Sequence, residues 1–509
     1  MASNHGSEEA LLLPAPYSSS TNCYRFPFSV TMLLTHGYFL AEDPREQRIM
    51  KPYPPLGILS IAAWLRQRGM DVELFDTTFS TWPQFQQHLL DNPPQVVGIY
   101  TNLMTKLNVL RAVGFIKGTP ALRHTKVVLG GPEIRHHAER FLQHGADVVA
   151  IGEGEQTMEE LLRCIKEGGE LEQVAGIAFL RGGQLIRTPE RALLRSIDEL
   201  PIPFREGIPL ERYLQTWKQH HGASSISIST MRGCPYTCRW CSRAVYGGTY
   251  RRRSPAAVAD EMEQLRDRYN PDSLWFVDDV FTINHRWLEG FAAELAARKL
   301  RIPYECITRA DRLNERAVEL LKTTGCFRVW IGAESGSQRV VDAMDRRVKV
   351  EQVRQMIQLS KRHGIQTGTF IMVGYPGETE ADILETIHHL KVSNPDHYTI
   401  TVAYPITGTP LFNEVQSQLI SPPEWAASTD RDLEFQRPYS RRYYRFAISR
   451  ITHEVQAHKL ANGSGNGSVL ARLNHQARAV AAAMAMRFER RFGTATSAQK
   501  PLPNSPTKT

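Results

Sequence analysis

Short apolar runs alternate with amphipathic stretches from residue 30 onward. The stretches have helical spacing: Ile58, Ala62 and Leu65 fall on one helical face, and Gly69 is placed to end that helix. Strands that alternate with helices predict a parallel, doubly wound sheet. The predicted strands are Val30–Leu34, Val72–Phe75, Val96–Tyr100, Val127–Leu129 and Val148–Ile151.

A second strand–helix series begins at Ser225. Six strand–helix units of one hand predict a partial (β/α)6 barrel of the TIM type, with functional residues at the carboxyl ends of its strands. The predicted strands are residues 226–230, 273–277, 302–307, 328–331, 366–372 and 398–402, and the predicted helices between them are residues 255–269, 287–297, 315–323, 350–363 and 380–390.

The segments outside these series lack a clear period. Prolines mark a linker between the two series, with a helical turn expected within Leu210–Trp217, and Asn462–Ser468 separates two C-terminal helices. We therefore expect an α/β protein with a Rossmann-like first domain, a barrel and a mainly helical C-terminal region. The expected divisions are residues 1–25 (disordered tail), 26–185 (first domain), 186–223 (linker), 224–412 (barrel) and 413–509 (helical region ending in a disordered tail).

The composition is that of an ordinary globular protein. The 509 residues are 42% hydrophobic and 22% charged, and no run approaches the roughly eighteen apolar residues that span a bilayer. Leu11–Leu13 is too short for a signal peptide and lacks a basic flank. Seven cysteines, an odd number with three of them clustered, favour a reducing compartment, so we expect a cytoplasmic protein. The net charge of +8 is mild.

The clustered cysteines follow the first predicted barrel strand. Cys234, Cys238 and Cys241 are spaced C-x3-C-x2-C. Three thiolates on one loop can hold three irons of a 4Fe–4S cluster and leave the fourth iron open for another ligand. Two alternatives are three unrelated cysteines in a turn, or a zinc site that lacks a ligand, although a structural zinc site needs four ligands.

This motif resembles the signature of radical S-adenosylmethionine (SAM) enzymes. The resemblance rests on the cysteine spacing, on Trp240 before the last cysteine and on the preceding Ser229–Gly233 segment. It implies that SAM chelates the fourth iron through its amino and carboxylate groups. Electron transfer from the cluster would then cleave SAM to a 5′-deoxyadenosyl radical.

The resemblance also assigns residues that would hold SAM at the strand ends. Trp240 would contact adenine, or serve only in loop packing. Asp278 would accept from the SAM amino group; alternatively, Asp278 and Asp279 cap the helix that follows. Arg309 would bind the SAM carboxylate, or pair with Asp311.

Two further turns complete the expected SAM site. Glu334 and Ser335 would contact the ribose and the amino group; the alternative is a helix N-cap formed by Ser335 or Ser337. Gly374 begins a Gly-x-Pro-Gly-Glu-Thr turn that would lie near the adenine. No catalytic residue beyond these cofactor contacts is assigned.

Strand-end glycines in the first domain resemble those of cobalamin-binding domains found upstream of one radical SAM subgroup. The resemblance rests on Pro54–Leu59, on the Gly130-Gly131-Pro132-Glu133 turn and on the Gly152-Glu153-Gly154-Glu155 turn. It implies cobalamin contacts; alternatively, the glycines are only turn residues. The first predicted strand is not followed by G-x-G-x-x-G, which counts against a dinucleotide.

The sequence lacks the Asp-x-His-x-x-Gly motif whose histidine ligates cobalt in many cobalamin domains. His36 lies at the first strand end without the flanking residues, and we interpret it as a polar surface group. We therefore expect cobalamin to bind without a protein imidazole beneath the cobalt.

Together these features resemble the cobalamin-dependent radical SAM group that includes the anaerobic magnesium-protoporphyrin ester cyclase and the hopanoid methylases. The resemblance implies methylation of an unactivated carbon in a small-molecule or lipid-like substrate, with an electron donor such as flavodoxin or ferredoxin. The alternative is a radical cyclase or rearrangement enzyme with the same cofactors. An RNA methylthiotransferase would need a second cysteine trio and an RNA-binding domain, so we expect no nucleic acid partner. A non-catalytic cobalamin sensor would not need the cysteine loop.

The two C-terminal helices combine arginines with aromatic residues. Such a surface suits an anionic membrane, which would fit a lipid-like substrate; alternatively the helices pack on their own domain with a solvated charged face. The residues concerned are Arg441, Arg442, Arg445, Arg450, Arg487, Arg490 and Arg491, with Tyr443, Tyr444, Phe446, Phe488 and Phe492.

Overall fold

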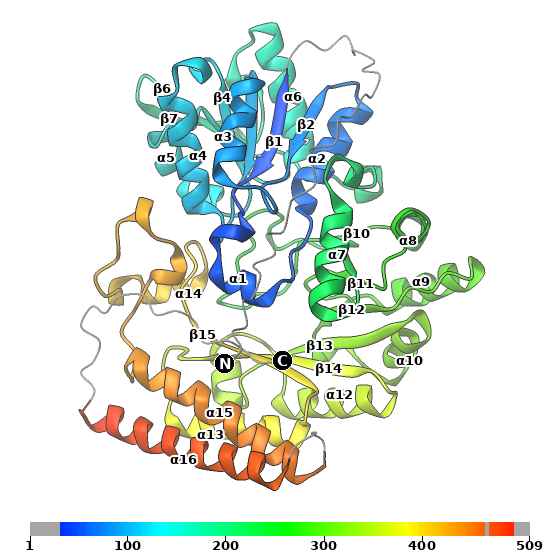
Figure 1. The fold of residues 1–509 in the computed structure, drawn as a ribbon, viewed down its shortest axis with the longest axis vertical. Coiled ribbons are helices and arrows are strands. Elements are labelled where there is room, and N and C mark those ends of the chain that lie inside the picture. Colours follow the sequence, from blue (N-terminus) through cyan, green and yellow to red (C-terminus); the bar gives the residue numbers. More distant parts are fainter. Residues whose placement is uncertain (1–30, 464–467, 493–509) are drawn as a thin grey trace, which may run out of the picture.

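The computed structural model describes residues 31–463 and 468–492. The expected tails, and most of the Asn462–Ser468 linker, lie outside these ranges. Two sheets organise the described residues, and they occupy opposite halves of the molecule in Figure 1. No helix among the described residues is both long enough and apolar enough to cross a bilayer.

The first sheet has seven strands in the order β2-β1-β3-β4-β5-β6-β7. The five predicted strands are present and parallel. An antiparallel hairpin, β6–β7, extends the sheet and was not predicted. The strands are β1 (Met32–His36), β2 (Val72–Phe75), β3 (Val96–Tyr100), β4 (Lys126–Gly130), β5 (Val148–Ala150), β6 (Ile177–Arg181) and β7 (Gln184–Arg187).

Helices cover both faces of this sheet, as a doubly wound fold requires. Leu33 points into a core shared with α3 (Trp82–Asp91), α4 (Lys106–Gly118) and α5 (Ile134–Gln143). Its neighbours Met32 and Leu34 point to the opposite core, formed with α2 (Leu56–Gln67) and α6 (Gly154–Glu167). Because side chains alternate along a strand, two covered faces explain the continuous apolar runs.

The second sheet confirms the predicted partial barrel. Its six strands are all parallel and stand in chain order, and the two edge strands, β8 and β15, are not paired with each other. The strands are β8 (Ser225–Ile228), β11 (Ser273–Phe276), β12 (Tyr304–Thr308), β13 (Cys326–Glu334), β14 (Gln366–Val373) and β15 (His397–Val402). The connecting helices are α8 (Pro255–Tyr269), α9 (His285–Ala297), α10 (Glu315–Thr324), α11 (Gln338–Ala343), α12 (Val350–Arg362) and α13 (Glu380–Ser393).

The C-terminal helices belong to the barrel core. Helix α15 (Arg441–Ala461) packs on α13, and α16 (Val469–Phe492) packs on α15. Tyr443 and Tyr444 are fully buried in the barrel core. Of the two alternatives that the sequence left open for these helices, packing on their own domain is confirmed for these two tyrosines, and a membrane contact is wrong for them.

The segment after the barrel also returns to the first sheet. The buried amino group of Lys106 on α4 donates to the carbonyl oxygens of Trp425 (2.6 Å) and Ser428 (2.7 Å). The Trp425 ring packs against Phe141 of α5, with ring centroids 4.9 Å apart. These contacts hold the two halves of the chain together on one side.

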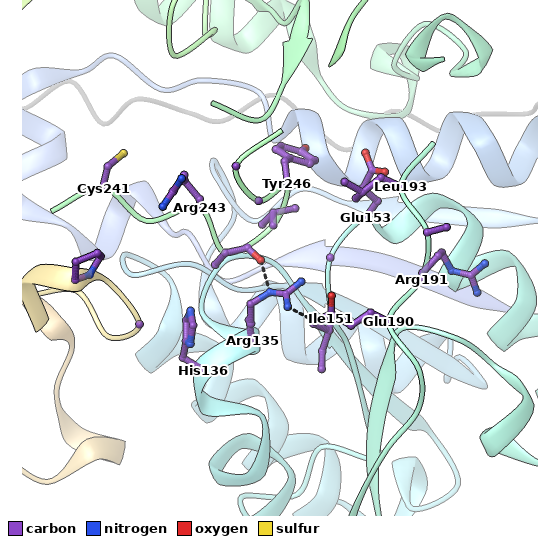
Figure 2. A pocket seen from close by; sticks show the side chains of 18 residues that line it. Arg135, His136, Ile151, Glu153, Glu190, Arg191, Leu193, Cys241, Arg243 and Tyr246 are labelled. Carbon is purple, nitrogen blue, oxygen red and sulfur yellow. Dashed lines mark hydrogen bonds and ion pairs between the residues drawn. The ribbon is translucent and has the colours of Figure 1, made fainter. Parts of the chain in front are cut away.

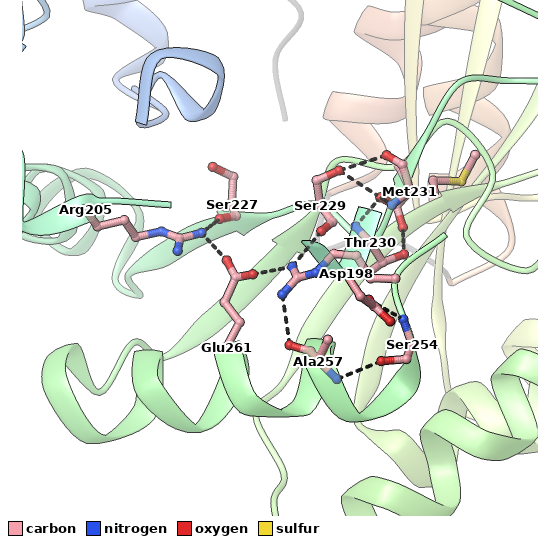
Figure 3. Close-up of polar contacts among 11 residues, drawn as sticks. Asp198, Arg205, Ser227, Ser229, Thr230, Met231, Ser254, Ala257 and Glu261 are labelled. Carbon is pink, nitrogen blue, oxygen red and sulfur yellow. Dashed lines mark hydrogen bonds and ion pairs between the residues drawn. The ribbon is translucent and has the colours of Figure 1, made fainter. Parts of the chain in front are cut away.

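The predicted linker is anchored in the barrel at two points. It forms α7 (Leu210–His221), a longer helix than the turn that was expected, and Tyr213 of α7 is buried in the barrel core. Upstream, the guanidinium of Arg205 donates to Glu261 of α8 (2.6 Å) and to the Ser227 carbonyl of β8 (3.0 Å), as Figure 3 shows. Arg253 reaches the other carboxylate oxygen of Glu261. The linker therefore places the charged guanidinium group of Arg205 in the interior of the barrel.

Candidate functional site

The cysteine loop is closed at its base by a short antiparallel pair. Strands β9 (Met231–Arg232) and β10 (Arg251–Arg252) pair with each other, so residues 233–250 project from the carboxyl end of β8. Gly233 has φ +84°, and a Cβ there would lie 2.4 Å from the Thr249 carbonyl oxygen. Only glycine fits this close approach. The base of the loop is therefore fixed.

Asp278, at the end of β11, holds the same loop from the side. Its buried carboxylate accepts from the backbone N–H of Thr230 (2.7 Å) and of Met231 (3.2 Å), and from the Thr230 hydroxyl. The alternative capping role is wrong, because the side chain of Asn284 caps α9. A SAM contact by Asp278 stays a prediction. What the geometry supports directly is a positioning role for Asp278.

The three thiols have different surroundings. Cys234 is half-buried, Cys238 is buried and Cys241 is exposed, and all three are free. Burial raises the pKa of Cys234. This thiol would therefore become a good ligand only as a bound metal displaces its proton.

Two buried guanidinium groups lie beside Cys238. Nη1 of Arg309 is 3.8 Å and Nη1 of Arg346 is 3.6 Å from its Sγ. Both arginines are nearly inaccessible to solvent. Two positive charges directed at one sulfur suit a negatively charged group at that place. Arg346 was not singled out from the sequence, because nothing in the Asp345–Arg347 segment distinguishes a buried arginine from a surface one.

An iron–sulfur cluster fits this arrangement. Each of the three cysteines would bind a different iron of a cubane, so the thiols need not converge on one point. The free thiols on one fixed loop, with two cations beside the buried one, fit such a cluster.

The remaining predicted SAM residues surround the loop. Nε of Arg309 donates to Asp311 (2.8 Å), so the pairing anticipated as an alternative is present. Glu334 has φ +66° and lies 3.7 Å from Arg346, and burial raises the pKa of its carboxyl group. Trp240 packs partly buried against a cluster that includes Met344. Contacts from these residues to SAM stay predictions.

Ser335 and Gly374 occupy buried turns. The Ser335 hydroxyl lies 3.2 Å from that of Thr386 and accepts from the N–H of Ser337 (3.1 Å). Ser337 is the N-cap residue of α11, as the alternative anticipated, but its hydroxyl donates to Asp382 (2.6 Å) instead of bonding to the first turn of the helix. Gly374 has φ +77°, and its N–H donates to the buried carboxyl group of Glu378 (2.5 Å). Their SAM contacts also stay predictions.

The strand-end glycines of the first sheet divide into two kinds. A Cβ at Gly131 would lie 2.3 Å from the Thr101 carbonyl oxygen, so this glycine is needed for packing, whereas a Cβ at Gly154 would meet the end of the Ile61 side chain (2.6 Å). A Cβ at Gly130 would meet nothing within 4 Å, and at Gly152 only atoms 3.8 Å or more away. The open backbone at Gly130 and Gly152 fits the approach of a large ligand such as cobalamin.

Glu153 joins the two halves of the molecule. Its carboxylate pairs with Arg232 of β9 (2.8 Å) and Arg251 of β10 (2.9 Å), and Arg232 also reaches Glu155. Because these arginines engage both of its oxygens, only the Glu153 backbone remains to contact cobalamin. Arg232 lies within the Ser229–Gly233 motif, but its partners could not be identified without the fold.

A cavity of about 400 Å³ lies where the two halves meet. Figure 2 shows it between α5 and the β5–α6 turn on one side and the cysteine loop on the other. Gly152 and Cys241 both line it, so the expected cobalamin turn and a cluster ligand share one chamber. Arg243 also lines it and forms no ion pair with any described residue, which leaves one uncompensated positive charge at the wall.

His36 is not the surface group that we expected. It is only 5% exposed, its Nε2 lies 2.9 Å from Asp76 Oδ1, and its Nδ1 accepts from the N–H of Tyr38 (3.2 Å). Burial would raise the pKa of Asp76, but the hydrogen bond from His36 is among several that lower it below its usual value. Both ring nitrogens are occupied, so neither is free for cobalt.

We expect His36→Ala to leave the cobalt environment unchanged. Electron paramagnetic resonance of the cob(II)alamin-loaded protein should show no nitrogen splitting from a lower protein imidazole, before or after the substitution. The variant should instead lose about 1–3 kcal/mol of stability to unfolding, because Asp76 loses a buried partner. A nitrogen splitting that disappears in His36→Ala would show that the histidine is a ligand.

Comparisons with known proteins agree with this arrangement. Residues 228–390 match the Radical SAM superfamily, and residues 48–162 match the B12 binding domain. An uncharacterized methyltransferase of Pyrococcus horikoshii is 27% identical over 386 residues, 74% of this chain and 82% of that protein. The anaerobic magnesium-protoporphyrin IX monomethyl ester cyclase of Synechocystis sp. is 26% identical over 361 residues, 69% of this chain and 70% of the cyclase.

Among solved structures, the fold is similar to that of the radical S-adenosylmethionine methyltransferase TsrM from Kitasatospora setae, which has cobalamin and a 4Fe-4S cluster bound. The TM-score is 0.65 at 20% identity, over 76% of this chain and 78% of that chain. The protein is thus an enzyme that combines a radical SAM domain with a B12 binding domain. These two domains imply its cofactors, which are a 4Fe–4S cluster, SAM and cobalamin.

Proposed function

We propose that the enzyme methylates an unactivated carbon of a small-molecule or lipid-like substrate. The observation that carries this proposal is the cavity that Gly152 and Cys241 both line, because a substrate held there meets both cofactor sites. When bound, the cluster and SAM supply a radical that removes a hydrogen atom, and cobalamin supplies a methyl group. A reaction that needs both the radical and the methyl group explains why one cavity joins the cluster site and the cobalamin site.

The chain's own part in this chemistry is positioning. The β9–β10 pair and Asp278 hold the cysteine loop, and Arg309 and Arg346 balance negative charge at Cys238. The pairs from Glu153 to Arg232 and Arg251 keep the two walls of the cavity together.

The assignment of individual contacts is part of the proposal. We propose that Cys234, Cys238 and Cys241 bind the cluster, that Trp240, Asp278, Arg309, Glu334, Ser335 and Gly374 contact SAM, and that Gly130, Gly131, Gly152, Gly154 and the backbone of Glu153 line the cobalamin site. Residues 26–185 are the proposed cobalamin domain, 224–412 the radical SAM barrel and 413–509 the C-terminal region, with 186–223 between the first two.

The proposal includes partners and a compartment. An external donor such as flavodoxin or ferredoxin would reduce the cluster, and the C-terminal helices would bring the enzyme to a membrane surface where lipid-like substrates are found. Free cysteines suit the reducing cytoplasm, where we place the enzyme.

A radical cyclase is the second candidate, because the matched relatives include the Synechocystis magnesium-protoporphyrin ester cyclase. Methyl-labelled SAM distinguishes the two functions. In a methyl transfer, each turnover consumes two SAM and two electrons from the donor, and gives one methylated product, one S-adenosylhomocysteine, one 5′-deoxyadenosine and one methionine. We expect the two nucleoside products in equal amounts and label in the product. An altered but unlabelled product with 5′-deoxyadenosine alone would support the cyclase.

A further inference from the structure

Helix α16 carries an exposed apolar face. Its opposite face, with Ala479, Ala482 and Met486, is buried. Spacings of three, four and seven residues place the exposed apolar side chains on one side of the helix. These side chains are 53–76% exposed, and they are Val469, Leu470, Leu473, Val480, Met484, Phe488 and Phe492.

The charged residues of α16 are almost all basic. Its single acidic residue, Glu489, is buried and accepts from the Ser440 hydroxyl (2.9 Å), with Arg442 3.3 Å away. Arg490 pairs with Glu380. The remaining arginines, Arg472, Arg478, Arg487 and Arg491, form no ion pair with any described residue. The exposed side of α16 is therefore apolar and cationic.

Helix α15 does not share this character. On that helix, Arg441 pairs with Glu434 (3.4 Å), and Arg450 pairs with Glu454 (2.9 Å). Tyr443 and Tyr444 are buried. Among the described residues of these two helices, the large exposed apolar side chains are on α16, which lies at the end of the molecule opposite the seven-stranded sheet (Figure 1).

We propose that the exposed face of α16 docks in the surface of an anionic membrane. A cationic helix with one apolar face lies parallel to the bilayer, with apolar side chains inserted and arginines at the lipid headgroups. A second copy of the chain is a poorer occupant, because two α16 faces would bring arginines together without an acidic partner. The inference rests on the membrane contact proposed for the C-terminal helices and is independent of the reaction.

Vesicle flotation of the full-length, cofactor-loaded protein tests the proposal. We expect flotation with phosphatidylserine-containing phosphatidylcholine vesicles, and weaker flotation with phosphatidylcholine alone. Leu473→Gln/Met484→Gln/Phe488→Gln should abolish binding. Arg487→Gln/Arg491→Gln should weaken binding to anionic vesicles about thirtyfold at low salt, since each arginine near the surface contributes about 1 kcal/mol.

A matched control removes exposed apolar residues elsewhere. Leu90→Gln/Leu107→Gln/Leu384→Gln changes three leucines that are 39–41% exposed, and it should float like the unaltered protein. Equal flotation of the α16 triple variant and this control would overturn the proposal. The proposal would also be wrong if the unaltered protein bound no vesicles and sedimented as a dimer, and the α16 triple variant sedimented as a monomer. Retained SAM cleavage in the α16 variant separates membrane docking from the reaction.

Discussion

Reconstituted Cys238→Ala should produce no 5′-deoxyadenosine from SAM. The substitution removes one of the three proposed cluster ligands and leaves the guanidinium groups of Arg309 and Arg346 facing an apolar methyl group. Both effects act at the same place, because the two guanidinium groups lose one of their acceptors and an incomplete ligand set does not hold a cubane. The measurements are iron and sulfide content after anaerobic reconstitution, and nucleoside products with a chemical reductant.

Two other buried cysteines provide the control. Cys306 and Cys326 lie in the barrel core, and neither is near the loop in the sequence. Cys306→Ala and Cys326→Ala should lose some stability, because each leaves a small cavity, but they should keep the cluster and cleave SAM. Full SAM cleavage by Cys238→Ala would overturn the cluster assignment.

The largest expected stability effect belongs to Glu261→Ala. Glu261 is 1% exposed and sits between Arg205 and Arg253 (Figure 3). Removal of one partner from a buried ion pair leaves an uncompensated charge and typically costs about 3–5 kcal/mol. We expect a loss of that size in the free energy of unfolding of the cofactor-free protein, measured by urea denaturation.

Glu263→Ala on the same helix is the matched control. Glu263 is partly exposed and pairs with Arg298 (2.9 Å), and such surface pairs contribute about 0–1 kcal/mol. Burial would raise the pKa of Glu261, but the two arginines hold it below the ordinary value. The ion-paired contribution is therefore present at neutral pH and is lost as pH falls through the lowered pKa. Equal losses in the two variants would contradict the buried-pair account.

Local sequence signals predicted most of the regular elements. Strand Val72–Phe75 and helix Pro255–Tyr269 have the predicted bounds, and Ser254 caps the helix at its predicted start. The β6–β7 hairpin was missed although Gly182 and Gly183 between two short apolar runs are a hairpin signal.

The errors concern residues whose surroundings come from distant segments. His36 is buried because Asp76, at the end of the neighbouring strand, accepts from it. Tyr443 and Tyr444 follow arginines, and only the packing of α15 on α13 shows that they point inward. The cysteine loop could be found from spacing alone. Of the two arginines beside Cys238, Arg309 was singled out through the resemblance, but Arg346 was not, because its partners are far away in the chain.

The contact between Glu153, Glu155, Arg232 and Arg251 has a consequence for domain exchange. A hybrid enzyme assembled from this barrel and the cobalamin domain of a relative must carry carboxylates at both glutamate positions, or two arginines at the base of the cysteine loop lose their partners. A barrel and a cobalamin domain from different relatives are therefore compatible only when the charges at these four positions match.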